Sequence, residues 1–395
     1  KNDNDGRYFL LSNKNIINGQ IIISDADRRI NKESFSKINK RTKLESGDLV
    51  ISTVGVLGKL AIIKTENLNY DFQRSVGIVK CDEKKINTKY LYYYLNTQFV
   101  QNRLNHLSKG AVQKCLFISD LKNLEIDFPD LPTQQKIASV LSALDDKIEL
   151  NNRINAELEA MAKTLYDYWF VQFDFPIVTS SGVEKPYKTS GGKMVYNETL
   201  KREIPEGWEV KSLYKIADFI NGLACQKFRP ENENDDYLPV IKIREMNEGK
   251  SNNTERARIN IPEKNIINDG DVLFAWSASL DVKIWTEGKG ALNQHIFKVV
   301  SKDFPRSFYY FELLNYLQHF KMMAELRKTT MGHITIDHLK TSYISIPPKN
   351  LIEKLDKKLN ILIEKIIINQ KQNQELSALR DWLLPMLMNG QVKVG

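Results

Sequence analysis

The sequence predicts a mixed α/β (α+β) protein in which two globular domains form a tandem repeat. The domains are joined by two long helices that form an antiparallel coiled coil. Three observations predict this fold: polar and apolar residues recur at a fixed offset, strand-like runs alternate with helical stretches in each half, and two long segments carry a heptad seam. A chain of 395 residues is expected to hold two or three domains.

The repeat is clearest in the second part of each half. Asn151, Asn155 and Leu158 match Asn369, Asn373 and Leu376 at an offset of 218 residues. The same offset relates ISDLKNLEIDFP (118–129) to IDHLKTSYISIP (336–347). Upstream, three pairs of segments resemble each other: SGDLVIS (46–52) and DGDVLFA (269–275), FQRSVGIVK (72–80) and NQHIFKVV (293–300), YFLLSNKNIINGQ (8–20) and YLPVIKIREMNEGK (237–250). The predicted order is a first domain (1–130), a helix (131–172), a linker (173–203), a second domain (204–346) and a second helix (347–390).

The front of the first domain is short. Residues 204–236 precede the Tyr237 segment of the second half, whereas only seven residues precede Tyr8. We expect about a strand and a helix to be missing there, through truncation or disorder. Lys1 is not an initiator methionine, so we also expect the native amino terminus to be missing.

Within each domain, Val- and Ile-rich runs bounded by Gly or Asp predict strands. They are 48–52, 60–64, 76–80, 271–276 and 296–300. The stretches 88–107 and 305–328 predict helices, and their aromatic residues lie at helical spacing. We interpret these aromatic residues as core rather than as platforms for stacking bases.

The two long helices carry seams with alternating steps of four and three residues, which is the coiled-coil period. The seams are Ile137, Leu141, Leu144, Ile148, Asn151, Asn155, Leu158, Ala162, Leu165, Trp169 and Leu355, Leu359, Leu362, Ile366, Asn369, Asn373, Leu376, Arg380, Leu383, Leu387. If the helices pair antiparallel, the asparagine layers meet. Buried amide pairs penalise slipped registers, so we expect Asn151, Asn155, Asn369 and Asn373 to set the register. The alternative is a shifted seam with these asparagines facing water.

Composition narrows the class of partner. The net charge of +8 indicates either a polyanionic partner or an ordinary basic surface. Residues 1–130 carry +6, whereas residues 204–346 are neutral, so a second DNA-binding domain must use local patches. No apolar run reaches the ~18 residues of a membrane span. The three cysteines are far apart and are expected to be reduced thiols in a cytoplasmic protein.

Catalytic motifs are not evident. GVLGK (55–59) lacks the spacing of a phosphate-binding loop and predicts a strand turn, and no GxGxxG or HExxH pattern is present. The separation of His333 and His338 is poor for metal binding, and Asp145 and Asp146 are expected on a solvated helix face. We therefore expect no catalytic residue, no cofactor and no metal, which favours a binding or scaffold role.

Candidate DNA contacts follow from side-chain chemistry. Arg and Lys neutralise phosphates, while Arg, Asn and Gln read base edges. The candidates are Lys14, Arg28, Arg29, Gln73, Arg74, Lys109, Lys114, Lys242, Arg244, Arg256, Arg258, Gln294, His295, Arg327 and Lys328. In the predicted repeat, Gln73 and Arg74 match Gln294 and His295. For any one of these residues, a plain solvated side chain is the alternative.

At this point the sequence resembles the specificity (S) subunits of type I restriction-modification systems. The resemblance covers essentially the whole chain and rests mainly on three segments: residues 131–176, residues 185–210 and the closing DWLLPMLMNGQVKVG (381–395). It implies that each globular domain is a target recognition domain that reads one half of a bipartite, asymmetric DNA site. It also implies that the coiled coil sets the spacer and docks two modification subunits, which methylate adenine. Restriction subunits with ATP-driven translocase and nuclease activity then join.

Two alternatives remain open from sequence alone. The first is an enzyme whose catalytic residues lie in this chain, which the missing motifs argue against. The second is a scaffold in which a coiled coil spaces two domains that bind partners other than DNA.

Overall fold

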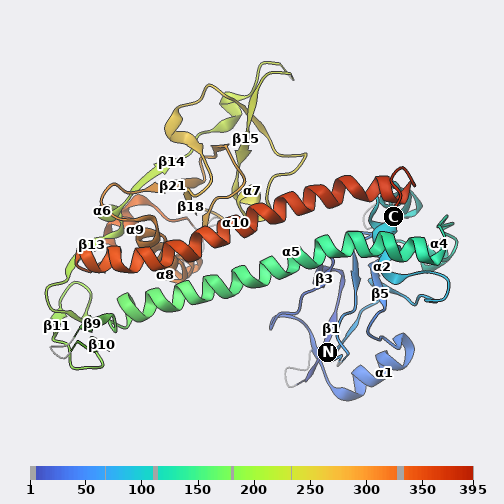
Figure 1. Cartoon of the computed structure of the whole chain (residues 1–395), viewed down its shortest axis with the longest axis horizontal. Coiled ribbons are helices and arrows are strands. Elements are labelled where there is room, and N and C mark those ends of the chain that lie inside the picture. Colours follow the sequence, from blue (N-terminus) through green and yellow to red (C-terminus); the bar gives the residue numbers. More distant parts are fainter. Residues whose placement is uncertain are drawn as a thin grey trace. The chain divides into compact units, whose positions relative to one another are not determined.

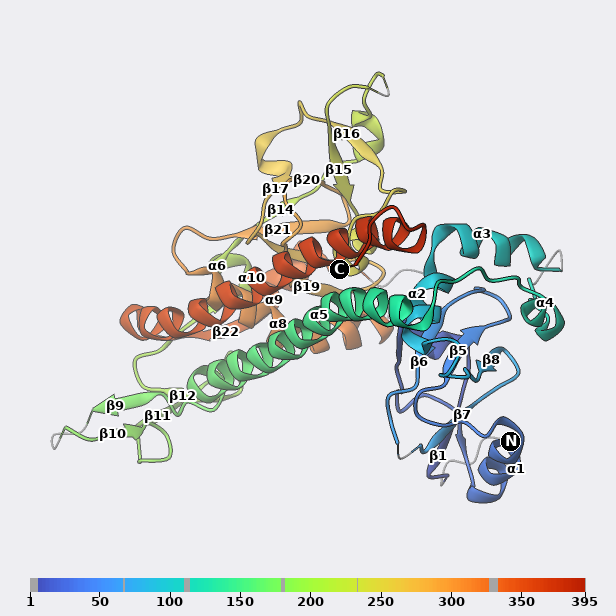
Figure 2. The same ribbon diagram turned by 45° about the vertical axis from the view of Figure 1, so that its right-hand side comes forward.

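The computed structural model describes residues 6–66, 68–109, 114–178, 182–232, 234–326 and 333–394. Two compact units are present: residues 1–149 with 374–395, and residues 150–373. Each long helix contributes one part to each unit (Figures 1 and 2). Among the described residues, no helix combines the length and the apolar character needed to cross a membrane.

The first unit contains two three-stranded sheets. Its elements before the long helix are β1 (Tyr8–Leu11), η1 (Asn13–Asn15), β2 (Ile16–Ile17), β3 (Gln20–Ile21), β4 (Arg29–Ile30), α1 (Lys32–Thr42), β5 (Leu49–Ser52), β6 (Leu60–Ile62), β7 (Tyr70–Phe72), β8 (Val76–Val79), α2 (Thr88–Asn96), α3 (Gln98–Leu107) and α4 (Ile118–Lys122). Strand β1 pairs antiparallel with β4 and parallel with β7. Strand β5 pairs antiparallel with both β6 and β8.

The globular part of the second unit has larger sheets. Its elements are β13 (Glu209–Ser212), α6 (Leu213–Ile216), β14 (Asp218–Asn221), η3 (Cys225–Phe228), β15 (Tyr237–Ile241), α7 (Ile243–Glu248), β16 (Arg256–Arg258), η4 (Glu263–Asn265), β17 (Ile266–Ile267), β18 (Val272–Ala275), β19 (Asp281–Ile284), β20 (Gly290–Leu292), β21 (Ile296–Val300), α8 (Arg306–Leu326), α9 (Ile336–Thr341) and β22 (Tyr343–Ile346). The four-stranded sheets have the orders β14-β21-β18-β19 and β16-β15-β20-β17.

The strand pairing of the first domain recurs in the second. Strand β15 pairs antiparallel with β16 and parallel with β20, as β1 does with β4 and β7. Strand β18 pairs antiparallel with β19 and β21, as β5 does with β6 and β8. The predicted tandem repeat of mixed helix–sheet domains is therefore confirmed.

The register corrects two of the sequence alignments by one residue. Ser52 lies opposite Val76 and Ala275 lies opposite Ile296, so Arg74 is equivalent to Gln294 and not to His295. Likewise Leu11 and Ile241 occupy equivalent positions, which makes Tyr8 equivalent to Leu238 rather than to Tyr237. Identical Gln and Tyr side chains favoured the wrong register, yet a one-residue slip moves every strand side chain to the opposite face.

Among the described residues, the first domain has no counterparts of strands β13, β14 and β22 of the second domain. In the second domain, β13 pairs with β22 and β14 pairs with β21. No described strand precedes β1, and the segment 125–128, which is equivalent to β22, does not form a strand. Phe128 in this segment is exposed. The lost pairing explains why similar sequences, LEIDFP and SYISIP, adopt different local structures.

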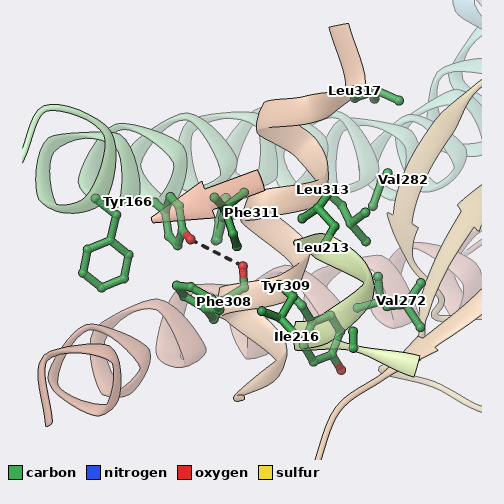
Figure 3. Packing of buried hydrophobic residues seen from close by; sticks show 14 of the residues in the cluster. Tyr166, Leu213, Ile216, Val272, Val282, Phe308, Tyr309, Phe311, Leu313 and Leu317 are labelled. Atoms are coloured by element: carbon green, nitrogen blue, oxygen red, sulfur yellow. Dashed lines mark hydrogen bonds between the residues drawn. The ribbon is translucent and has the colours of Figure 1, made fainter. Parts of the chain in front are cut away.

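The helix predicted over 88–107 is divided at Thr97. Thr97 has extended backbone angles, and its hydroxyl accepts a hydrogen bond from the Val100 N–H, so it caps α3. The aromatic residues of α2 and α8 are largely core, as predicted, with Tyr90, Tyr93 and Phe311 buried. Figure 3 shows Phe308 and Phe311 of α8 beside Tyr166, within the largest apolar cluster of the second unit.

The long helices are α5 (Leu131–Tyr166), which continues as a π-helical turn η2 (Asp167–Val171), and α10 (Lys349–Met388). Every residue of the two predicted seams is buried or half-buried. The helices run antiparallel in each unit. In the second unit Asn155 contacts Asn369 and Asn151 contacts Asn373, and in the first unit Asp145 contacts Arg380. The predicted antiparallel coiled coil is confirmed.

The segment predicted as a linker, 173–203, belongs mostly to two hairpins. They are formed by β9 (Pro176–Val178) with β10 (Glu184–Pro186) and by β11 (Met194–Asn197) with β12 (Arg202–Pro205). Phe173 and Phe175 pack on Trp208 with ring centroids 5.2 and 5.6 Å apart, so the segment has an aromatic core that joins it to the second domain.

Candidate nucleic-acid interface

Each domain brings three distant segments together at the end of its central strand. In the first domain, the Thr53 N–H donates to the Ser75 carbonyl (2.9 Å), and the Leu116 N–H donates to the Thr53 carbonyl (2.8 Å). The Gly55 N–H donates to the Lys114 carbonyl (3.0 Å). We call residues 53–59, 73–75, 109 and 114–117 the first loop cluster.

The second domain repeats this scaffold around Trp276. The Trp276 N–H donates to the His295 carbonyl (3.3 Å), and the Ile334 N–H donates to the Trp276 carbonyl (2.8 Å). Ser277 forms a bridge with His333, as Val54 does with Cys115. We call residues 276–280, 293–295 and 333–334 the second loop cluster. Because the backbone bonds are equivalent, Thr53, Ser75 and Cys115 correspond to Trp276, His295 and His333.

Several predicted DNA contacts lie in these two clusters. Arg74, Lys109 and Lys114 are exposed in the first, where the Lys109 ammonium lies 5.8 Å from the centre of the Phe117 ring. Gln73 is half-buried, and its amide donates to the Leu10 carbonyl (3.5 Å). The structure thus gathers side chains that are separated by up to 41 residues in the sequence. In the second cluster, Gln294 is half-buried and His295 is exposed.

A second group of candidates lies on equivalent sheet edges. Phe9 faces Arg29 across β1 and β4, as Pro239 faces Arg256 across β15 and β16, so the two arginines are equivalent. The Arg29 guanidinium lies 5.1 Å from the centre of the Phe9 ring, and that of Arg256 lies 4.3 Å from the centre of the Tyr237 ring. Arg258 stands two residues along β16, with its guanidinium 5.3 Å from the centre of the Phe228 ring. Arg28, exposed, precedes β4.

Some candidate cations already have carboxylate partners. Lys14 Nζ lies 2.8 Å from the buried Asp27 carboxylate, and this contact holds the pKa of Asp27 well below its usual range. Lys242 pairs with Glu255 at 2.5 Å and lowers the pKa of that carboxyl group. Arg244 pairs with the buried Glu245. These contacts favour a structural contribution from Lys14, Lys242 and Arg244. The candidates Arg327 and Lys328 lie outside the described residues.

The four seam asparagines form a hydrogen-bonded group in the second unit. The Asn369 amide donates to Asn155 Oδ1 (2.8 Å), and the Asn151 amide donates to Asn373 Oδ1 (2.9 Å). Asn151, Asn155 and Asn369 are no more than 5% exposed. The Asn155 amide also donates to the Ile366 carbonyl (3.4 Å), so the buried amides have partners on the facing helix.

A charged group completes the seam in the first unit. The Arg380 guanidinium lies 2.7 Å from the Asp145 carboxylate, which also accepts a hydrogen bond of 2.6 Å from the Tyr93 hydroxyl. Burial is the largest single influence and lowers the pKa of Arg380, but the hydrogen bonds that its guanidinium donates to Asp145 and Asp381, together with the charges of these carboxylates, make the net shift upward. The prediction that Asp145 lies on a solvated face is therefore wrong, whereas Asp146 is exposed. The sequence did indicate an acidic partner, because Arg380 is a charged residue at a seam position.

Sequence reasoning also missed a buried carboxyl group in the second unit. The Tyr166 hydroxyl donates to Glu312 Oε1 (2.6 Å) and also to the Phe308 carbonyl (3.5 Å), which is the dashed contact in Figure 3. Burial raises the pKa of Glu312 to about 7 and raises that of Tyr166 as well. Both residues are buried and Tyr166 belongs to the largest apolar cluster of the second unit, so their hydrogen bond belongs to the core.

The chemistry of both loop clusters suits binding rather than bond breaking. They offer hydrogen-bond donors and acceptors, aromatic rings and cations, which are the groups that recognise base edges and phosphates. Within the described parts of the chain, no group of three or more His, Cys, Asp or Glu side chains is placed to hold a metal ion.

Comparison with known proteins gives a consistent result. The sequence profile described as "Type I restriction modification DNA specificity domain" matches residues 1–160 and 205–378. The type I restriction enzyme MjaIX specificity subunit of Methanocaldococcus jannaschii is 29% identical over 387 residues, covering 95% of this chain and 84% of that protein. The HindI specificity subunit of Haemophilus influenzae is 24% identical over an alignment that covers 88% of this chain and 87% of that protein. The crystal structure of a type I S subunit from M. genitalium has the same fold, with a TM-score of 0.53, 15% identity and coverage of 98% of this chain and 89% of that chain.

Proposed function

This chain belongs to the family of type I restriction modification DNA specificity domains, and we propose that each of its globular domains reads one half of a bipartite, asymmetric DNA site. Specificity subunits are the components of type I restriction-modification systems that recognise DNA sequence, and they are not catalytic. The chain is accordingly a non-catalytic subunit. We propose that it acts in the cytoplasm, where double-stranded DNA is its ligand, and that it needs no cofactor of its own.

The observation that carries this proposal is the repeated strand pairing around two loop clusters of different composition. Thr53, Ser75 and Cys115 of the first domain have the same backbone contacts as Trp276, His295 and His333 of the second, but all three side chains differ. Two copies of one binding scaffold with different side chains suit two half-sites of different sequence. A symmetric protein would instead favour a palindrome.

We assign DNA contacts to the loop clusters and the equivalent sheet edges. Arg28, Arg29, Arg74, Lys109 and Lys114 would serve the first half-site, and Arg256, Arg258, Gln294 and His295 the second. The neutral charge of residues 204–346 fits readout through few base contacts, with phosphate contacts supplied in part by partner subunits. Lys14, Lys242 and Arg244 are weaker candidates because each is paired with a buried or half-buried carboxylate, whereas the partner of Arg29, Asp25, is fully exposed.

The coiled coil is the proposed ruler for the DNA spacer. Its asparagine layer fixes the register of α5 against α10, because a slip of one heptad would set buried amides against leucine side chains without hydrogen-bond partners. A fixed register gives the connection between the domains a fixed length. The unspecified gap between the half-sites would then be constant.

We further propose that two modification subunits, which methylate adenine, dock on this chain and that restriction subunits join them. The coiled coil offers exposed apolar side chains for such contacts, notably Ile361 and Ile368, which share a face of α10, and Trp382. Tyr166, Trp169 and Leu387, which also lie near the ends of the seams, are buried within their own units and serve as packing residues. Trp382, which is 57% exposed, is therefore the first residue to replace.

Methylome sequencing tests the proposal. A host that expresses this chain with its cognate modification subunits should show a split motif, with two short half-sites at a constant gap and methylated adenine in each. A host with the modification subunits alone is the control and should lack the motif. If the complete complex assembles but yields a palindrome or no motif, the chain does not read two half-sites.

A further inference from the structure

The second loop cluster places two imidazoles against one indole ring at the surface of the second domain. The centre of the Trp276 ring lies 5.8 Å from that of His295 and 6.4 Å from that of His333. Both histidines are exposed. Ser277 Oγ lies 3.1 Å from His295 Nδ1, which orients this imidazole and leaves Nε2 as its other hydrogen-bonding atom.

The same cluster contains two buried polar atoms that have no hydrogen-bond partner among the described residues. One is the indole nitrogen Nε1 of Trp276, a donor, and the other is Oε1 of Gln294, an acceptor. Nearly all buried polar atoms in folded proteins are paired, so a donor and an acceptor that have no partner among the described residues suit a ligand that offers both an acceptor and a donor. A base edge, which presents both donors and acceptors, matches this need.

The backbone of the cluster is strained at Ala278. Its φ is +55°, in the left-handed region that side chains other than glycine rarely adopt. The equivalent residue of the first domain is Gly55, with a φ of +77°. Strain of this kind persists where the surrounding structure imposes it, and such positions concentrate at binding sites.

We propose that Gln294, His295 and His333 are the specificity-determining residues of the second domain and contact base edges in the major groove. Trp276 supports both imidazoles, and its indole N–H is a further donor for the same ligand. This inference rests on the proposed function and assigns to one cluster the reading of the second half-site. The amide of Gln294 can pair with an adenine, and the ring nitrogens of the two histidines donate to or accept from neighbouring bases.

The assigned base contacts can be tested with variants of the full chain in complex with its modification subunits. His295→Ala, His333→Ala and Gln294→Ala are each compared with His319→Ala, which removes an exposed histidine of α8 outside the cluster. In a panel of DNA duplexes with single base-pair changes, loss of a base contact should remove a discrimination of roughly 5- to 150-fold at the contacted position. Arg74→Ala in the first loop cluster serves as the reciprocal variant.

The expected result is that the three cluster variants lose discrimination in one half-site, that Arg74→Ala does so only in the other, and that His319→Ala matches the wild type. The inference is overturned if the cluster variants keep the wild-type profile, or if they and Arg74→Ala alter the same half-site. Because the panel scores relative affinity, a variant that binds weakly still gives a profile, and its unfolding temperature verifies its fold. If the wild-type complex itself recognises no split site, the proposed function fails, which is a different outcome.

Discussion

The buried asparagine pair of the coiled coil gives the sharpest prediction. Asn155→Ala removes the oxygen that accepts the Asn369 amide at 2.8 Å, in a place where both side chains are buried. The facing amide is then left without this partner. Losing a hydrogen bond in this way costs about 1–3 kcal/mol, because the remaining buried group keeps its full desolvation penalty. We expect a loss of about 2 kcal/mol in the free energy of unfolding of the second unit.

The double variant Asn155→Leu/Asn369→Leu should behave differently. Replacing both partners with apolar side chains removes the unsatisfied groups, so its stability should equal or exceed that of the wild type. Asn152→Ala is the matched control. Asn152 is exposed and accepts the Asn373 amide (2.8 Å), so its replacement should cost less than about 0.5 kcal/mol.

Thermal unfolding followed by circular dichroism checks these values. For a domain of about 150–250 residues, 1 kcal/mol corresponds to roughly 2–4 °C in Tm, so Asn155→Ala should lower the Tm by about 4–8 °C. Because the asparagines fix the register of the helices, the double leucine variant should be stable yet give a less uniform DNA spacer. If Asn155→Ala and Asn152→Ala have the same small effect on Tm, the buried asparagine pair does not stabilise the seam.

Three further predictions follow from the long helices and the core. Inserting seven residues after Glu149 and again after Asn373 lengthens each helix by about 10.5 Å and keeps the seam. Methylome sequencing should then show a DNA spacer that is longer by at most about three base pairs. Insertions of three residues at the same places should abolish the motif. Burial raises the pKa of Glu312 to about 7, above its usual value near 4.5, so the folded state retains a proton that the unfolded chain loses. The free energy of unfolding should therefore fall as pH rises from about 4.5 to 7, and Glu312→Gln should flatten this dependence in thermal unfolding at pH 5 and pH 8. Arg380→Met should lower the free energy of unfolding of the first unit by about 2 kcal/mol in urea unfolding, because it leaves the half-buried Asp145 without its cation. Adding Asp145→Asn to the same chain should restore most of this loss.

The tandem fold could be predicted because its signals are local and periodic. Seam spacing, strand-like runs and a constant offset each depend on residues within a few turns or on simple self-comparison. The register within the strands could not, because the side chains on a strand repeat every two residues and one shared residue, such as Gln73 with Gln294, favours an alignment that is wrong by a single position. The hairpins of residues 173–203 were missed because their stability comes from Trp208 and its aromatic neighbours, beyond the segment itself.

The ion pair between Arg380 and Asp145 could have been predicted from the sequence. Once Asn151 faces Asn373, an antiparallel register sets Arg380, seven residues after Asn373, against residues just six or seven before Asn151. Asp145 stands there. By contrast, Tyr166 and Glu312 meet only because α8 packs on α5, and no spacing within the sequence specifies that contact.

The candidate site was only partly predictable, and the reason lies in how the two domains differ. Their central strands keep the same character, since Val50 and Ile51 of β5 and Leu273 and Phe274 of β18 are all buried. The residues that follow change completely, from small or cationic side chains to an indole and two imidazoles. Folding constrains the strands and the buried residues of the loop clusters, such as Leu116 and Ile334, whereas the exposed side chains of these clusters can vary. His333 was not a candidate because its place beside Trp276 depends on a bridge between segments 56 residues apart. The same separation of roles implies that exchanging loop-cluster side chains on an unchanged strand scaffold should alter the recognised half-site while leaving the unfolding temperature of the domain nearly constant.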